Sequence, residues 1–188
     1  MFKEADGQIL LKVARAAIET HLNGKKFKLP KEMGRFSEAC GVFVSLHKDG
    51  QLCGCVGLPW PTKPLSEGLV EAAVQASEDR RFSPLVPDEV PEIEIEVSVL
   101  SQPEELKSSE PDDILSKLKP NVNGLIVRKG ERGALFLPQV WEQIPDPEEF
   151  LTHLCVKAGL SPSAWTEKGC QFWRFKVQIF KDLGKNDL

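Results

Sequence analysis

The stretch GVFVSLHKDGQLCGCVG, residues 41–57, decides the fold of the first half of the chain. Two runs that favour β-strands flank a turn whose Asp49-Gly50 pair is typical of a hairpin. We therefore expect antiparallel strands over residues 42–46 and 52–58. The second strand ends in Gly-Cys-x-Gly, and glycines beside a cysteine leave its thiol sterically open. Because open thiols serve nucleophilic, redox or ligand chemistry, Cys55 is the first candidate functional residue.

Helical and strand patterns on either side of this hairpin complete a first unit. Apolar residues recur at helical spacing over residues 8–22, and Asn23-Gly24 supplies a stop signal. A second helix is expected from Pro64 to about Ser77, since a proline suits the first helical turn. Residues 93–100, IEIEVSVL, alternate between apolar and polar side chains, which predicts a half-buried strand.

The second half of the chain repeats this order of elements. Residues 112–118 can form a short helix, and residues 124–127 and 134–137 a second hairpin. Asp146 is a natural N-cap for the next helix, with Pro147 at its first position. A strand over residues 172–180 follows.

Each half therefore has the order helix, hairpin, helix, strand. This order predicts an α+β fold in which helices pack on a largely antiparallel sheet. Within a single domain spanning 1–188, it also predicts a structural duplication, with one αββαβ unit at 1–104 and a second at 105–188. The alternative is that this order recurs by chance in an α+β protein.

The composition is that of an ordinary globular protein. Apolar residues make up 41% and charged residues 28% of the 188 residues, which is enough to bury a full core. The net charge of -4 lacks the basic excess of nucleic-acid binders and disfavours that class. No run approaches the roughly 20 apolar residues of a membrane span, and the N-terminus lacks an apolar signal core, so we expect a cytoplasmic protein.

Five cysteines scattered over the chain indicate reduced thiols rather than a disulfide framework, although hyperthermophile cytosols can hold disulfides. A tetrahedral metal site built from Cys53 and Cys55 with Cys155, Cys170 or His153 is conceivable. The spacing lacks the C-x₂-C pairs of structural zinc, however, and Cys155 lies on the apolar face of its helix. We therefore predict no metal and no cofactor.

The register of the first hairpin decides which residues Cys55 meets. In a regular strand, Cys53 and Cys55 project to the same face. A two-residue Asp49-Gly50 loop pairs His47 with Leu52 and puts His47 on the opposite face from Cys55, whereas a three-residue loop puts the two on one face. Only the second register permits a cysteine–histidine pair. Even there the two residues are separated along the sheet, so we favour two unrelated, half-exposed side chains.

A second group of candidates, EDRRFSPL at 78–85, closes the second helix. Arginines beside acids usually form a surface salt-bridge cluster. If this helix end borders the Cys55 strand, an arginine there can instead bind a carboxylate or phosphate. Trp60, between two prolines, can stack on a ligand, although such a tryptophan more often covers the core. The candidate substrate-binding residues beside Cys55 are Gly54, Gly57, Arg80, Arg81, His47 and Trp60.

Six blocks of sequence, spread in order over nearly the whole chain, match one known group. They are GVFVSLHKDGQLCGCVG at 41–57, DRRFSPL at 79–85, EIEVSVL at 94–100, GLIV at 124–127, LFLPQVWE at 135–142 and EEFLTHLCVKAGL at 148–160. The chain resembles the AMMECR-type domain family. The most distinctive block of that family, Leu-Arg-Gly-Cys-Ile-Gly, corresponds to LCGCVG at 52–57, with Val56 in place of isoleucine and Cys53 in place of arginine.

The resemblance implies an α+β protein with a larger and a smaller part, a cleft beside the hexapeptide and no firmly established reaction. It also implies Memo-like and radical-SAM-like proteins as candidate partners in a shared modification pathway, because such domains are fused to or encoded near them in some genomes. The family arginine would share the cysteine's face and favour a thiolate or a bound anion. With Cys53 in that place, either this role is dispensable or Arg80 or Arg81 supplies the charge.

Two functional hypotheses follow. The first is an enzyme or enzyme subunit that uses a cleft beside Cys55, with Arg80 or Arg81 as anchor, to act on a small anionic molecule or a protein side chain. The second is a non-catalytic binding or scaffold module. In that module the glycines let another backbone approach closely and the cysteine fills a small space. We favour the first.

Overall fold

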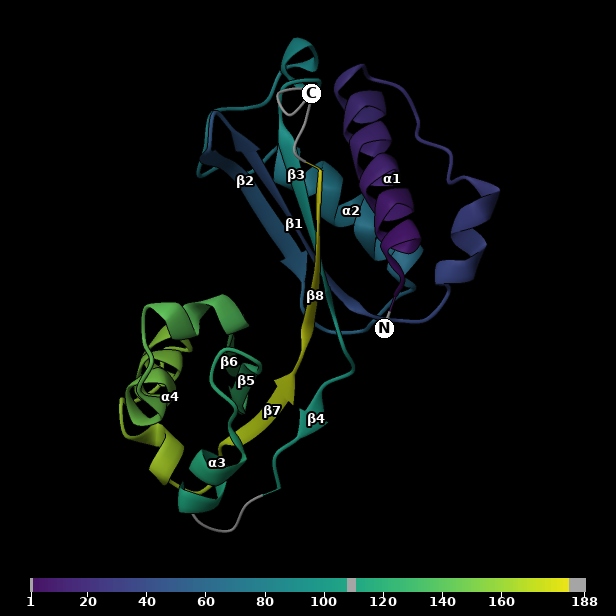
Figure 1. Cartoon of the computed structure of the whole chain (residues 1–188). Helices are drawn as coiled ribbons and strands as arrows, with labels where there is room; N and C mark the ends of the chain where they lie inside the picture. The colour runs from purple at the N-terminus through teal and green to yellow at the C-terminus, as the bar shows by residue number, and fades with distance from the viewer. Residues whose placement is uncertain (1, 108–110, 183–188) are drawn as a thin grey trace. The chain divides into compact units, whose positions relative to one another are not determined.

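A computed structural model describes residues 2–107 and 111–182, with residues 111 and 112 described in their backbone only. The described chain forms two compact units, unit 1 with residues 2–100 and 178–182, and unit 2 with residues 101–177 (Figure 1). Each unit has its own buried hydrophobic cluster. No helix in the described ranges is long and apolar enough to cross a membrane.

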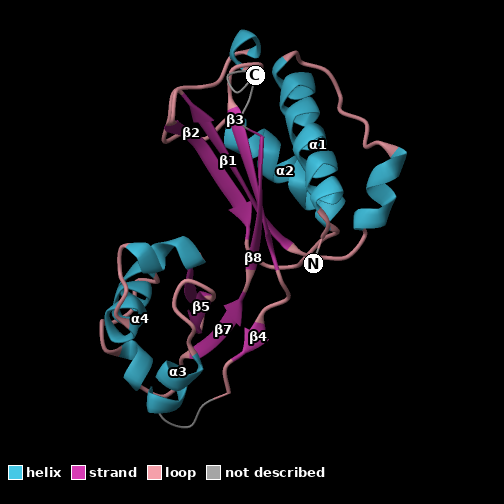
Figure 2. Cartoon of the chain, in the orientation of Figure 1, coloured by secondary structure: helices cyan, strands magenta, loops and turns pink. Residues whose placement is uncertain are grey.

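Unit 1 packs two helices on one face of a four-stranded sheet (Figure 2). Its sheet has the strand order β2-β1-β3-β8, and β1 is antiparallel to both of its neighbours. The fully buried Val42, Val44 and Leu46 of β1 face these helices. The elements are α1 (Glu4–Leu22), a 3₁₀ helix (Lys31–Phe36), β1 (Gly41–Lys48), β2 (Gln51–Leu58), α2 (Leu65–Ser77), a 3₁₀ turn (Pro87–Glu89), β3 (Glu94–Leu100) and β8 (Val177–Asp182).

Unit 2 has a second four-stranded sheet with the order β4-β7-β5-β6. Trp141 stacks on Phe150 in its core, with ring centroids 3.7 Å apart. Asp146 caps α4 as predicted, because its side chain accepts the N–H groups of Glu148 and Glu149 at 3.0 and 2.9 Å. The elements are β4 (Glu104–Glu105), α3 (Pro111–Lys117), β5 (Gly124–Lys129), β6 (Arg132–Phe136), a 3₁₀ helix (Pro138–Glu142), α4 (Pro147–Lys157), a 3₁₀ helix (Ala164–Thr166) and β7 (Gln171–Phe175).

The order helix, hairpin, helix, strand occurs in both units. Strands β2-β1-β3 of one sheet take the places of β6-β5-β7 in the other, and β8 and β4 occupy the equivalent fourth positions. Strand β4 follows β3 along the chain, and β8 follows β7. The fourth strand of each sheet is therefore connected in sequence to the last strand of the other sheet. The predicted α+β class with antiparallel sheets is confirmed. An origin of the two units by duplication stays a prediction.

The strand expected over residues 172–180 is two strands in different sheets, β7 and β8, with a break at Lys176. Phe172 belongs to the buried cluster of unit 2, and Phe180 to that of unit 1. Alternation of apolar and polar residues marks an extended segment, but it does not show that the two ends enter different cores.

Candidate functional site

The β1–β2 hairpin turns through the two-residue loop Asp49-Gly50. Both residues have positive φ, 52° for Asp49 and 71° for Gly50, as a tight hairpin of this kind requires. His47 accordingly pairs with Leu52, which is the first of the two registers that the sequence allows.

A β-bulge at Cys53 then changes the face on which the next residues lie. Leu46 pairs with Gly54, so Cys53 is the extra residue on β2. Cys53 packs against the core cluster of unit 1, and its Sγ donates to the Leu46 carbonyl at 3.3 Å. Cys55 instead pairs with Ser45, which alternates with the buried Leu46 and lies on the other face of the sheet. The expectation that the two cysteines share a face is therefore wrong.

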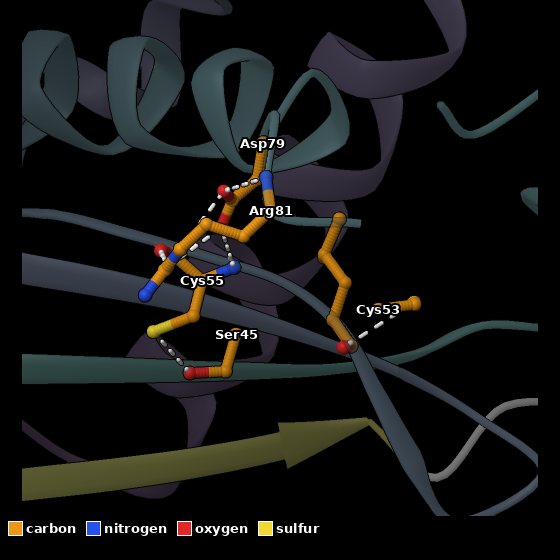
Figure 3. Close-up of polar contacts among 6 residues, drawn as sticks. Ser45, Cys53, Cys55, Asp79 and Arg81 are labelled. Carbon is orange, nitrogen blue, oxygen red and sulfur yellow. Dashed lines mark hydrogen bonds and ion pairs between the residues drawn. The ribbon is translucent and has the colours of Figure 1, made fainter. Parts of the chain in front are cut away.

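The same bulge puts His47 on the face of Cys55. In the regular strand β1, His47 and Ser45 point to one side of the sheet, and Ser45 pairs with Cys55. The inference that a two-residue loop separates His47 from Cys55 is wrong, because the extra residue in β2 reverses the parity. Within the described residues the thiol's hydrogen-bond partner is Ser45, whose Oγ donates to Cys55 Sγ at 3.4 Å, and not His47 (Figure 3).

Asp79 and Arg81 hold the outer edge of β2 at Cys55 (Figure 3). The Cys55 N–H donates to Asp79 Oδ2 at 3.0 Å, and Arg81 Nη2 donates to the Cys55 carbonyl at 2.6 Å. Since β2 is an edge strand, these backbone groups have no neighbouring strand to pair with. The two side chains therefore replace the hydrogen bonds that another strand would make.

Asp79 also fixes the orientation of the Arg81 guanidinium. Arg81 Nε donates to Asp79 Oδ1 at 3.0 Å, and Nη2 donates to Oδ2 at 2.7 Å, which makes a bidentate pair. These hydrogen bonds from Arg81 hold the pKa of Asp79 well below its usual range. Asp79, and to a smaller degree Cys55, raise the pKa of Arg81. The Asp79 side chain is 7% exposed and that of Arg81 is 66% exposed.

The glycines on either side of Cys55 are both covered by other groups. A Cβ at Gly54 would lie 2.1 Å from the backbone oxygen of Ala76, so the end of α2 approaches β2 closely there. A Cβ at Gly57 would lie 2.1 Å from the ring of Phe43. Gly54 and Gly57 leave room for a helix end and an aromatic ring. Glycine is therefore needed at these positions for packing, which is a different reason from exposing the thiol.

Of the two predicted arginines, one is bonded to Cys55 and the other, among the described residues, is not. Arg81 contacts Cys55, whereas Arg80 is exposed and makes no hydrogen bond to Cys55 within the described residues. Trp60 follows β2 and is 36% exposed. The ligand-binding roles assigned to Gly54, Gly57, Arg80, Arg81, His47 and Trp60 stay predictions.

Three residues of the site carried too little signal to be chosen from the sequence: Ser45, Asp79 and Phe43. Ser45 is a small polar residue in an apolar strand, which indicates a position on the less buried face but no particular partner. From the sequence alone, Asp79 is an acidic residue beside two arginines and has no predicted partner. Its contact with the Cys55 backbone is seen only in the structure.

The described part of the chain offers no cluster of three or more His, Cys, Asp or Glu side chains that could hold a metal ion. All five cysteines are free thiols, with Cys40 and Cys155 buried. Burial raises the pKa of Cys155 to about 11 and also raises that of Cys40. These two thiols are therefore suited to packing rather than reaction.

The AMMECR1 family model matches residues 11–180. The chain belongs to the AMMECR1 family. A protein of Methanothermobacter thermautotrophicus is 45% identical to it over 183 residues, covering 95% of each chain. A protein of Methanocaldococcus jannaschii is 42% identical over 182 residues, covering 95% of this chain and 90% of the relative.

A solved structure supports the fold of this AMMECR1-family chain. The crystal structure of the uncharacterized protein PH0010 from Pyrococcus horikoshii matches with a TM-score of 0.88 and 37% sequence identity. The match covers 97% of this chain and 94% of that one. The resemblance seen in the six sequence blocks is confirmed, and it establishes the family and the fold without assigning a reaction.

Proposed function

We propose that this AMMECR1-family chain is an enzyme or enzyme subunit that acts on a small anionic molecule or a protein side chain, with Cys55 as the reactive thiol and Arg81 as the anchor. The observation that carries the proposal is the position of Arg81, which donates to the Cys55 carbonyl at 2.6 Å while its side chain remains 66% exposed. An accessible cation is therefore held at the backbone of the residue that carries the thiol.

The guanidinium is oriented before any ligand arrives. Asp79 engages Nε and Nη2, and Nη1 makes no hydrogen bond within the described residues. A guanidinium that is already fixed by a carboxylate loses little freedom when it binds an anion through its remaining donors. Arg81 is thus suited to hold a carboxylate or phosphate beside the thiol.

The surroundings of the sulfur also favour chemistry. Ser45 Oγ donates to Cys55 Sγ at 3.4 Å, so a hydroxyl group from the neighbouring strand β1 contacts the thiol directly. Cys53, which takes the place of the family arginine, lies in the bulge against the core. Arg81, from the segment after α2, supplies the charge in its stead.

The proposal predicts that Cys55 is the fastest-reacting cysteine of the native chain. In a time course with iodoacetamide at pH 7, with peptides quantified by mass spectrometry, we expect Cys55 to be alkylated at least about tenfold faster than Cys40 or Cys155. Urea-unfolded protein is the control, because all five thiols should then react at similar rates. Equal, slow labelling of the native cysteines would sink the proposal.

A second candidate function is a non-catalytic binding or scaffold module. The close packing at Gly54 and Gly57 favours it, because both glycines have a structural reason to be there. The partner in either proposal is a small molecule or a protein, with Memo-like and radical-SAM-like proteins as the candidates that the family resemblance implies.

A capture experiment distinguishes the two functions. With the tagged full chain as bait and a Memo-like or radical-SAM-like protein as prey, the scaffold reading predicts capture that survives Cys55→Ser and is lost on Trp60→Ala or Arg81→Gln. The enzyme reading predicts instead that Cys55→Ser abolishes modification of the bound partner or small molecule.

A further inference from the structure

Unit 2 contains a cleft that the proposed function does not use. It is formed by residues 101–104 leading into β4, by the 119–123 loop between α3 and β5, and by residues 174–176 at the end of β7. Its volume is about 340 Å³. Pockets for small ligands in proteins begin at roughly 300 Å³, so the cleft can hold a metabolite-sized molecule or part of one.

The lining of this cleft is positively charged, although the chain as a whole has a net charge of -4. The cleft carries three cationic side chains, Lys119, Arg174 and Lys176, and one carboxylate, that of Glu104. Charge of one sign gathered in a concave surface attracts ions of the other sign. The excess of cations therefore favours an anionic ligand.

The Glu104 carboxylate is already neutralised. Arg174 donates to it through Nε at 3.0 Å and through Nη2 at 2.8 Å, while its Nη1 donates to the Lys117 carbonyl at 3.1 Å. Each of the three guanidinium nitrogens of Arg174 thus already donates one hydrogen bond. The ammonium groups of Lys119 and Lys176 make neither an ion pair nor a hydrogen bond within the described part of the chain, so both remain available to a ligand.

Asn123, which lines this cleft, is a buried residue with an amide donor. The residue is only 3% exposed, its Oδ1 accepts the Lys119 N–H at 3.1 Å, and its carbonyl accepts the Trp141 indole N–H at 2.7 Å. The first of these bonds fixes the amide orientation, since only the oxygen can accept. Among the described residues Nδ2 has no partner, yet it is not sealed from solvent. Asn123 is also one of the residues that line the cleft.

We propose that this cleft binds the oxyanion group of a small molecule, a phosphate or a carboxylate, through Lys119, Lys176 and Asn123 Nδ2. Two uncommitted ammonium groups and one buried amide donor offer only hydrogen-bond donors, and an oxyanion offers only acceptors. The neighbouring Glu104–Arg174 pair keeps the sole carboxylate of the cleft from repelling the ligand. The site lies in unit 2 and is independent of the proposed role of Cys55 in unit 1.

The test is a titration of the ¹⁵N-labelled full chain with inorganic phosphate, and separately with acetate, at constant ionic strength set by chloride. We expect the side-chain amide signal of Asn123 to shift and saturate. Saturation by phosphate alone identifies a phosphate site, and saturation by both anions identifies a general oxyanion site. A shift that grows linearly with either anion and never saturates overturns the proposal.

Matched variants locate the site. Lys119→Gln and Lys176→Gln should each weaken binding about fivefold, because each removes one charge-assisted contact. Lys168→Gln, an exposed lysine of unit 2 outside the cleft, should leave the affinity unchanged. Cys55→Ser should also leave it unchanged, so failure here is distinguishable from failure of the proposed function. Equal affinities for Lys119→Gln, Lys176→Gln and Lys168→Gln would contradict the assignment.

Discussion

Asp79 is the residue that ties the Arg81 guanidinium to the edge of β2. Its side chain is 7% exposed and accepts hydrogen bonds from the backbone N–H groups of Cys55 and Arg81 and from the Arg81 guanidinium. A buried carboxylate with these contacts both stabilises the fold and orients the cation. The single residue therefore links the stability of the edge to the chemistry proposed for the thiol.

Replacement of Asp79 should lower the stability of the folded chain. We expect Asp79→Ala to lower the free energy of unfolding by about 2 kcal/mol, because the Cys55 N–H and the guanidinium lose their acceptor. Urea denaturation measures the change, and Asp88→Ala, at an exposed position, is the control. A loss no larger than that of the control would show that the Asp79 contacts contribute little.

The contribution of Asp79 should depend on pH in a defined direction. Its pKa is lowered in the folded chain, mainly by the hydrogen bonds from Arg81, so the unfolded chain takes up the proton first on acidification. The stability difference between wild type and Asp79→Ala should be constant at neutral pH and shrink as the pH falls below the ordinary aspartate pKa of about 3.9. Denaturation curves at several pH values test this, and a difference that widens in acid would be inconsistent with it.

At the scale of elements, the edge of β2 is shaped by the end of α2. The Ala76 carbonyl lies against Gly54, next to the bulge at Cys53. The local sequence predicts the hairpin and its two-residue turn correctly, since Asp49-Gly50 fits positive φ values. It does not predict the bulge, because the helix end that packs at Gly54 comes from a segment about 20 residues further along the chain.

The unpredicted bulge at Cys53 explains which parts of the site could be predicted from the sequence and which could not. Cys55 and Arg81 could be chosen as residue types suited to chemistry, and the structure brings them together. The sequence could not predict that one face of the sheet carries His47, Ser45 and Cys55. A one-residue bulge reverses every assignment of a side chain to a face beyond it.

The approach of α2 to β2 predicts a strong effect of a small substitution. Gly54→Ala should destabilise the chain by about 2 kcal/mol, because the new methyl group would overlap a backbone oxygen that cannot move without shifting the helix. Gly34→Ala is a matched control, since nothing lies within 4 Å of its Cβ position. Thermal unfolding of both variants measures the difference, and similar midpoints would refute the account of Gly54.

At the scale of the whole molecule, the chain builds two hydrophobic cores and crosses from one to the other twice. β3 leads into β4 and β7 leads into β8, so each sheet is completed by a strand that continues from the other. Phe180, on β8, is 3% exposed within the core of unit 1 and lies so close to α1 that a Cβ at Gly7 would be 2.0 Å from its ring. Unit 1 therefore depends on the C-terminal strand for its packing.

Loss of the Phe180 ring should loosen unit 1 selectively. We expect Phe180→Ala to cost about 3 to 4 kcal/mol and to accelerate amide hydrogen exchange in β1 and β3 more than in β5. Phe172→Ala, in the core of unit 2, should show the reverse pattern. Equal acceleration in both sheets for both variants would argue that the two cores unfold as one.

The most direct test of the central claim, that Arg81 and the Cys55 thiol act together, is the rate of Cys55 alkylation by iodoacetamide in two neighbouring arginine variants. At pH 7 we predict that Arg81→Gln slows the reaction by about tenfold, because the substitution removes both the hydrogen bond that holds the Cys55 backbone and the neighbouring positive charge. Arg80→Gln, at an exposed arginine without a hydrogen bond to Cys55 among the described residues, should leave the rate unchanged. An unchanged rate in Arg81→Gln, with the fold intact by circular dichroism, would contradict the account.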